Sequence, residues 1–139
     1  MISQQHEFIT AWAEFNPRDH INVLTGDERI LELDGSKRHV VLYDSWDDLI
    51  RCEEFGTWDA RLHLSLLPQP FFGDLSAASV FILMLNPGLH PADYYAESRD
   101  PEYRRALTDT LGQRPNRTYP FICFDPRFSW HSGFSYWHG

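Results

Sequence analysis

The sequence has few of the residues that mark several large classes of protein. Only two of its 139 residues are cysteine, Cys52 and Cys123, too few for a disulfide framework or for an iron–sulfur cluster, which takes about four thiolates. No stretch approaches the roughly 20 consecutive apolar residues that span a bilayer. The N-terminus mixes polar and apolar side chains from the start, unlike a secretory signal. These absences predict a reducing, cytoplasmic setting and no membrane partner.

Basic residues are also scarce. The net charge of −8 argues against a nucleic-acid partner, but the charge is unevenly distributed. Residues 1–98 carry 16 acidic and 6 basic side chains, whereas residues 99–139 carry 4 acidic and 6 basic ones. All six are arginines, whose planar guanidinium can bind phosphate. We expect weak phosphate binding at Arg114 and Arg117, with ordinary surface arginines as the alternative.

Apolar and aromatic residues are plentiful, at 42% and 15% of the chain. This composition predicts one globular domain over residues 1–139 with a substantial core. The Asp34-Gly35 turn between two alternating runs predicts a β-hairpin over residues 29–43. Helical spacing and capping residues predict three helices, over residues 4–15, 45–55 and 101–111.

Two apolar runs predict the strands of a parallel sheet. Residues 79–85 are apolar on both faces, as in a strand covered on both sides, and residues 118–126 form a second such run. The helix between them completes a right-handed βαβ unit. Residues 60–75 alternate before two prolines, as either a strand or an extended loop. We therefore expect an α/β fold, a three-layer α/β/α domain with a largely parallel central sheet, preceded by an N-terminal helix and the hairpin.

The first predicted strand leads directly into Asn86-Pro87-Gly88. As a structural element these residues form a good tight turn, because proline fixes φ and glycine accepts positive φ. As a functional element they lie at the carboxyl end of a strand, where open α/β sheets bind ligands. Asn86 then projects an amide that can orient water or hold a polar substrate, and Gly88 lets a ligand approach the backbone.

The stretch "PQPFFGDLSAASVFILMLNPG", residues 68–88, resembles the first motif of the uracil-DNA glycosylase superfamily. In that superfamily a buried strand runs into a short loop, which reads Asn-Pro-Gly in the mismatch-specific and single-strand-selective branches. The upstream "FFGDLSAASV" is similar to the segment that leads into this strand in many bacterial members. The close resemblance covers about residues 68–91 and continues more weakly to residue 126.

The resemblance implies a DNA-repair hydrolase that cleaves the N-glycosidic bond of a damaged base flipped out of DNA, with DNA as partner and no cofactor. Asn86 matches the residue that orients the water attacking the sugar C1′. Pro87 and Gly88 complete the loop, and Gly88 implies a roomy base pocket. Phe121 and Phe124 are the candidates for stacking on the flipped base, although an aromatic in an apolar run is more often part of the core.

The family's second motif, a histidine loop, normally lies much farther along the chain. Only 51 residues follow Gly88, and His131-Ser132 has neither the expected spacing nor the following proline. We therefore expect an N-terminal piece of a longer domain with half of the site missing. The alternative is a non-catalytic module that self-associates or binds a protein through its aromatic C-terminal segment: Phe134, Tyr136 and Trp137. An acidic DNA mimic is a third hypothesis.

The remaining clusters of reactive residues are weak. His131 and His138 are seven residues apart, but no cysteine or carboxylate completes a familiar set of metal ligands, and we predict no metal site. Cys123 and His131 could pair as a thiol nucleophile and its base. A thiol within an apolar run is, however, expected to be buried and inert.

Overall fold

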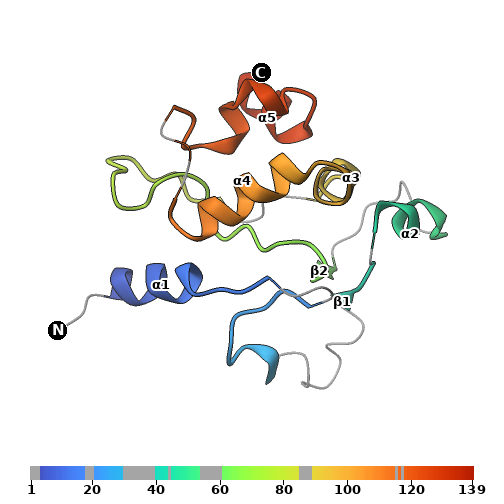
Figure 1. The fold of residues 1–139 in the computed structure, drawn as a ribbon, viewed down its shortest axis with the longest axis horizontal. Helices are drawn as coiled ribbons and strands as arrows, with labels where there is room; N and C mark the ends of the chain where they lie inside the picture. The colour runs from blue at the N-terminus through green and yellow to red at the C-terminus, as the bar shows by residue number, and fades with distance from the viewer. Residues whose placement is uncertain are drawn as a thin grey trace.

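The computed structural model describes residues 4–17, 21–29, 40–43, 45–53, 61–84, 89–114, 116 and 118–139. In this part of the chain helices dominate, and none is long and apolar enough to cross a membrane. Figure 1 shows α3 and α4 at the centre, with α5 on one side of them and α1 on the other. The helices are α1 (Gln4–Ala13), α2 (Trp46–Arg51), α3 (Pro91–Arg99), α4 (Pro101–Leu111), α5 (Ser132–His138) and the 3-10 helices η3 (Ile122–Phe124) and η4 (Pro126–Phe128).

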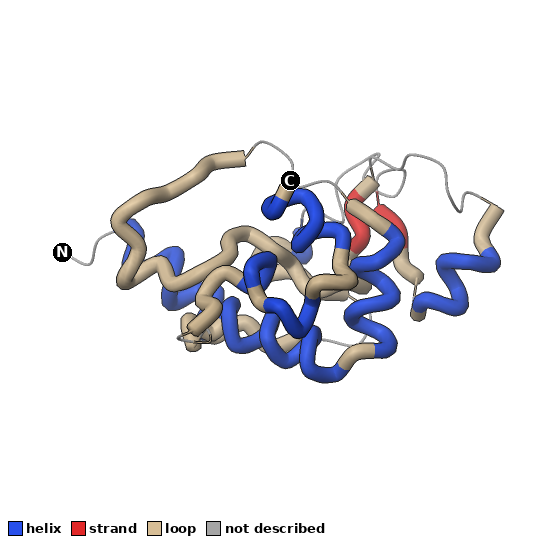
Figure 2. The backbone as a smooth tube through the Cα atoms, turned by 90° about the horizontal axis from the view of Figure 1, so that it is seen from above, coloured by secondary structure: helices blue, strands red, loops and turns tan. Residues whose placement is uncertain are grey.

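The only sheet among the described residues has two short strands, β1 (Val40–Val41) and β2 (Leu62–His63). They pair in parallel, with Val40 opposite Leu62 and Val41 opposite His63, and they appear in red in Figure 2. The expected three-layer α/β/α fold with a largely parallel central sheet is therefore wrong. Most of the predicted hairpin, residues 30–39, lies outside the described residues.

Neither apolar run of the expected sheet is a strand where the structure describes it. Residues 79–84 have no regular secondary structure, and residues 118–126 contain η3 and the start of η4. Pro120 and Pro126 have no N–H to donate to a strand ladder. The carboxylate of Asp125 accepts the N–H of Arg127 (3.1 Å), which favours a tight turn at this point.

Helices form at all three predicted places, but α2 ends at Arg51, with Cys52 as its C-cap, where the sequence predicted a helix to residue 55. Capping residues explain where α2 and α4 begin. The hydroxyl of Ser45 accepts the N–H of Asp48 (3.2 Å) at the start of α2. The carboxylate of Asp100 accepts two N–H groups in the first turn of α4, and Gly112 is the C-cap of that helix. The predicted helix over residues 4–15 corresponds to α1, which ends two residues earlier.

Helix α3 was not expected from the sequence, although the sequence contains the residues of its capping box. The His90 side chain accepts the N–H of Ala92 (3.1 Å), and the Asp93 carboxylate accepts the N–H of His90 (2.8 Å). Pro91 occupies the first helical position, where a missing N–H costs nothing. This cap holds Asp93 in the first turn of α3 as a buried side chain, and Asp93 is part of the site described below.

Helix α3 also joins the two apolar clusters of the core. Tyr94 lies in the smaller cluster, whereas Ala96 lies in the larger one. The larger cluster packs α4, η3 and η4 around α3, and the smaller one packs α2 and the chain after β2 against the other side. The buried members are Leu67, Ala96, Tyr103, Leu107, Ile122 and Phe128 in the first and Leu49, Leu66 and Tyr94 in the second.

Candidate functional site

The loop on which the sequence hypothesis depends falls between two described parts of the chain. Asn86, Pro87 and Gly88 lie outside the described residues, as does Arg117. The backbone is described up to Met84 and again from residue 89 onward. The roles assigned to these four residues therefore stay predictions.

The two candidate stacking residues, Phe121 and Phe124, lie in a cluster of aromatic rings. The rings come from η3 and the residue before it, from α5, and from the chain after β2. The ring of Phe121 contacts those of Phe72 (5.7 Å between centroids), Phe124 (5.0 Å) and Trp137 (5.2 Å). Phe124 is 42% exposed and also contacts His138. Phe121 is thus surrounded by other rings on several sides, and Phe124 is the more accessible of the two for a stacked base.

The aromatic C-terminal segment is only partly available to a partner. Trp137 packs on Phe121, and the ring of Phe134 stacks on His138 with centroids 3.9 Å apart. Tyr136 alone of the three predicted contact residues is widely exposed, at 69%. A single exposed tyrosine is ordinary for a protein surface and does not form an extended patch.

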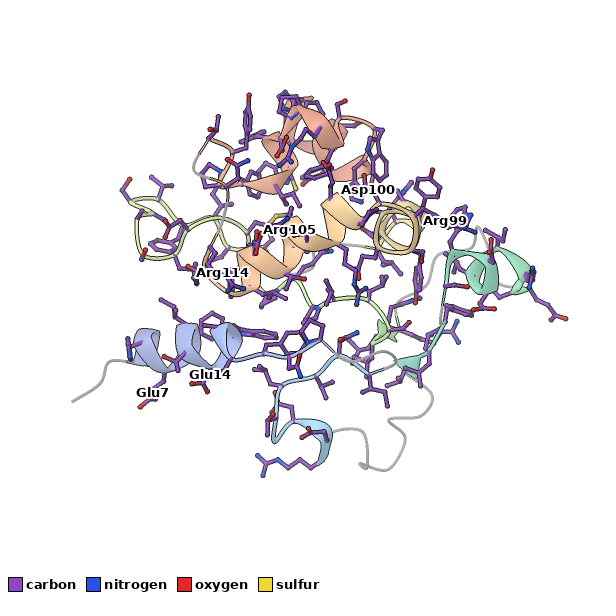
Figure 3. The ribbon with its side chains drawn as sticks, viewed as in Figure 1. Glu7, Glu14, Arg99, Asp100, Arg105 and Arg114 are labelled. Atoms are coloured by element: carbon purple, nitrogen blue, oxygen red, sulfur yellow. The ribbon has the colours of Figure 1, made fainter. Side chains whose placement is uncertain are left out.

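The described arginines of the C-terminal third lie next to carboxylates. Arg99 pairs with Asp47 (2.7 Å), and the more distant Arg114 lies 4.0 Å from Asp109. Figure 3 shows Arg105 and Arg114 along α4 and Arg99 at the end of α3 that faces α2. Exposed pairs of this kind are worth little energy, so the guanidinium of Arg114 is available to an anion. The other described pairs in this segment are Arg104–Glu97, Arg105–Asp109, Arg127–Asp125 and Arg127–Glu102.

Four polar or reactive side chains meet in the interior, where α3, α4, η3 and α5 come together. We call Asp93, Tyr103, Cys123 and His131 the Asp93 cluster. His131 is only 6% exposed, and its Nε2 lies 3.2 Å from Oδ1 of Asp93. The ring of Tyr103 stacks on that of His131 with centroids 4.8 Å apart. A β-carbon placed on Gly133 would lie 3.2 Å from both the Cys123 Sγ and the His131 Nδ1, so thiol and imidazole are close neighbours.

The hydrogen bonds of His131 indicate a structural role for the Asp93 cluster. Its Nδ1 accepts the N–H of Gly133 (3.0 Å) and so caps α5. A neutral ring with Nδ1 as acceptor carries its proton on Nε2, toward Asp93. That contact is electrostatic, because its angle does not meet hydrogen-bond geometry. With Nδ1 occupied, His131 has no lone pair left to accept a proton from a thiol.

Cys123 is inert in this environment. Burial, with a smaller contribution from the charge of Asp93, raises the pKa of its thiol to about 12. A nucleophilic cysteine needs the opposite, a pKa lowered toward neutrality. The thiol packs against the larger apolar cluster, which agrees with the expectation of a buried, unreactive cysteine. The Asp93 cluster therefore fastens α5 to α3 and α4 and does not form a thiol–imidazole pair.

Glu97 is a buried carboxylate next to this cluster that the sequence did not reveal. Its two oxygens accept the N–H of Leu67 (3.1 and 3.0 Å), and one of them pairs with Arg104 at 3.2 Å. The side chain is 3% exposed, and this desolvation raises its pKa to about 7 in spite of those partners. A glutamate on a helix is usually exposed, so only the packing of α3 identifies it.

The largest departure from the sequence prediction is the apolar run before Asn86. The sequence predicts a strand covered on both faces, whereas the structure exposes the side chains to solvent wherever it describes them. The loop that carries them, yellow-green in Figure 1, lies on the left of the molecule, away from β1 and β2, which lie to the right of its centre. We call residues 80–84 the apolar segment; its exposures are 75% for Val80, 57% for Phe81, 70% for Ile82, 95% for Leu83 and 45% for Met84.

An ordered turn holds the start of this loop. Oδ1 of Asp74 accepts the N–H groups of Ser76 (2.9 Å) and Ala77 (3.0 Å), and these bonds together with the Ser76 hydroxyl hold the pKa of Asp74 below its usual range. Gln113 at the end of α4 accepts the N–H of Leu75 (2.9 Å) and donates to the carbonyl of Thr110 (3.0 Å). The apolar segment thus extends from an anchored turn.

No protein-family model, curated protein or solved structure matches the chain.

Proposed function

We propose that this chain is a protein-interaction module whose binding element is the apolar segment, residues 80–84. The observation that carries the proposal is the exposure of five consecutive apolar side chains, one of them Leu83 at 95%. Monomeric proteins rarely expose contiguous apolar surface of this extent, and such patches commonly mark interaction sites. The anchored turn at Asp74 and Gln113 presents the segment at a defined place on the surface.

The reactive side chains inside the described part of the protein have structural roles, which supports a binding function in preference to a catalytic one. The imidazole of His131 caps α5, the Cys123 thiol stays protonated, and Glu97 holds the main chain at Leu67. Each of these groups stabilises the fold; His131 and Glu97 are buried and Cys123 is half-buried. Both cysteines are free thiols, and a reducing, cytoplasmic setting is part of the same proposal.

A fluorescent dye for exposed apolar surface, 1-anilinonaphthalene-8-sulfonate, tests this proposal on dilute protein. The wild type should enhance the dye's emission, and Leu83→Lys should remove more than half of the enhancement because the charge replaces the most exposed side chain of the apolar segment. Tyr136→Lys is the matched control, since it changes an exposed side chain elsewhere. Equal dye binding by the wild type and both variants would show that the segment is not an available surface.

A second candidate function comes from the sequence alone. Residues 68–88 resemble the first motif of the uracil-DNA glycosylases, and this resemblance supports hydrolysis of an N-glycosidic bond in DNA with Asn86 orienting the water. An amide can position a water molecule but cannot take its proton. Such an enzyme would therefore depend on stabilising the departing base.

Release of uracil from single-stranded DNA tests the second candidate. Wild type should release the base above background, and Asn86→Ala should lose that activity. Asn116→Ala is a suitable control because Asn116 is an exposed asparagine whose side chain accepts the N–H groups of its neighbours Thr118 (2.8 Å) and Tyr119 (3.5 Å). The same background release from all three proteins would exclude a glycosylase in this chain.

A further inference from the structure

The apolar segment has three properties of a strand that pairs with an identical strand: backbone groups without partners among the described residues, no charge, and exposed apolar side chains. We infer that two copies of this chain associate by pairing their residues 80–84 as antiparallel strands, with Ile82 opposite Ile82 at the two-fold axis. In this register Val80 of one copy faces Met84 of the other. The inference rests on the proposed function, because it assigns a partner to the same segment.

The main chain of the apolar segment has unused hydrogen-bonding capacity. No hydrogen bond joins the backbone of residues 80–84 to any other residue that the structure describes. Valine, phenylalanine and isoleucine favour extended strands, and an extended segment with free N–H and C=O groups can pair with a further strand. The segment pairs with neither β1 nor β2, which form the only sheet among the described residues.

The absence of charge in the segment permits a second copy as that strand. The protein has a net charge of −8, so two copies repel each other over most of their surface. Residues 75–84 contain no ionisable side chain, and a paired copy would bring only apolar groups against this stretch. The segment is therefore complementary to itself. An antiparallel pair meets the requirement of a two-fold interface that the same patch be used by both copies.

The exposed area is large enough for a specific contact. The exposures of the five side chains correspond to roughly 600 Å² of apolar surface in each copy. Two copies would bury at most about 1,200 Å² together, and less because the side chains of paired strands alternate between two faces. This is the size of a weak, transient interface. We expect a dimer that dissociates on dilution.

Sedimentation velocity over a range of concentrations tests the partner. The wild type should pass from monomer to dimer, Leu83→Lys should raise the dissociation constant about 30-fold or more through loss of apolar burial, and Tyr136→Lys should leave it unchanged. Circular dichroism checks that both variants fold. A wild type that binds the dye but stays monomeric would refute this inference and leave the proposed function standing. A monomer that does not bind the dye would refute both.

Cysteine cross-linking tests the register, in a Cys52→Ser background that keeps the unreactive Cys123. Ile82→Cys should form a disulfide-linked dimer on mild oxidation, because the two residues face each other across the axis. Val80→Cys should not, since its counterpart lies roughly 13 Å away along the strands, beyond the reach of a disulfide. Equal cross-linking at both positions would contradict the antiparallel pair and indicate parallel strands. Loss of the dimer in Tyr136→Lys alone would place the interface on α5 and overturn the inference.

Discussion

His131 and Asp93 connect two helix N-termini that are 38 positions apart in the chain, with Nε2 and Oδ1 separated by 3.2 Å. Each residue also belongs to the cap of its own helix, because Asp93 accepts the N–H of His90 in the cap of α3 and His131 accepts the N–H of Gly133 at the start of α5. The two caps therefore form one buried unit, and a change in either residue affects both helices.

Substitution of His131 should separate its two roles. His131→Ala removes the cap of α5 and the partner of Asp93, and we expect it to lower the free energy of unfolding by about 2–4 kcal/mol. His131→Asn keeps a capping side chain and should lose about 1 kcal/mol less. Urea unfolding measures both, with the exposed His138→Asn as control. Equal losses in the two variants would show that the cap contributes nothing.

Glu97 should make the stability of the protein depend on pH. Its pKa in the folded state, about 7, lies above its ordinary value of 4.5, so the folded protein holds this proton more tightly than the unfolded chain. The resulting stability is fully present below pH 4.5 and is lost as the pH rises through 7. The shift corresponds to about 3 kcal/mol.

Glu97→Gln should remove that part of the pH dependence, because an amide does not titrate. Urea unfolding at pH 5 and pH 8 should show a smaller loss of stability in this variant than in the wild type. Glu102→Gln, a change at an exposed carboxylate, should retain the wild-type loss. If the difference between pH 5 and pH 8 were the same for wild type and Glu97→Gln, the raised pKa of Glu97 would be refuted.

Cys123 should react with thiol reagents only when the protein unfolds. Raising its pKa from 9.0 to about 12 lowers the thiolate fraction about 1000-fold. Alkylation at pH 8, followed by mass spectrometry, should therefore modify Cys123 at least about 100-fold more slowly in the native protein than in urea. Fast labelling of native Cys123 would contradict the buried position of this thiol.

Gln113 should control how firmly the apolar segment is anchored. Gln113→Ala removes the acceptor for the Leu75 N–H, and we expect faster amide hydrogen exchange at Leu75. Gln113→Gly removes the same side chain but relaxes the positive φ of 52°, so it should be more stable than the alanine variant by about 1 kcal/mol. Unchanged protection of Leu75 in both variants would show that the anchor is not formed in solution.

The helices could be predicted from the sequence because their capping residues are local. Ser45, Asp100 and Gly112 form bonds with groups only a few positions away, and such bonds depend little on the rest of the fold. The same information was present for α3 in His90 and Asp93, although histidine is an unusual capping residue and its signal is easily missed.

The sheet could not be predicted, because a strand depends on partners that periodicity does not identify. The apolar run at residues 79–84 has the composition of a buried strand, but no other described strand lies beside it. The Asp93 cluster was only partly visible in the sequence, which pointed to Cys123 and His131 but not to Asp93 and Tyr103, because its members come from four separate elements and meet only through tertiary packing. Asn86 and its neighbours remain a sequence prediction.

Asp100 sets the order in which this protein is expected to fold. It ends α3 by donating its N–H to Ala96 (2.9 Å) and starts α4 by accepting from Glu102 and Tyr103, so no linker separates the two helices (Figure 3). Contacts between such close neighbours in sequence form quickly, whereas β1 and β2 must first close the chain between them. We therefore expect the α3–α4 elbow to form first and the strands and α5 to assemble on it later, an order that φ-value analysis of substitutions in α4 would test.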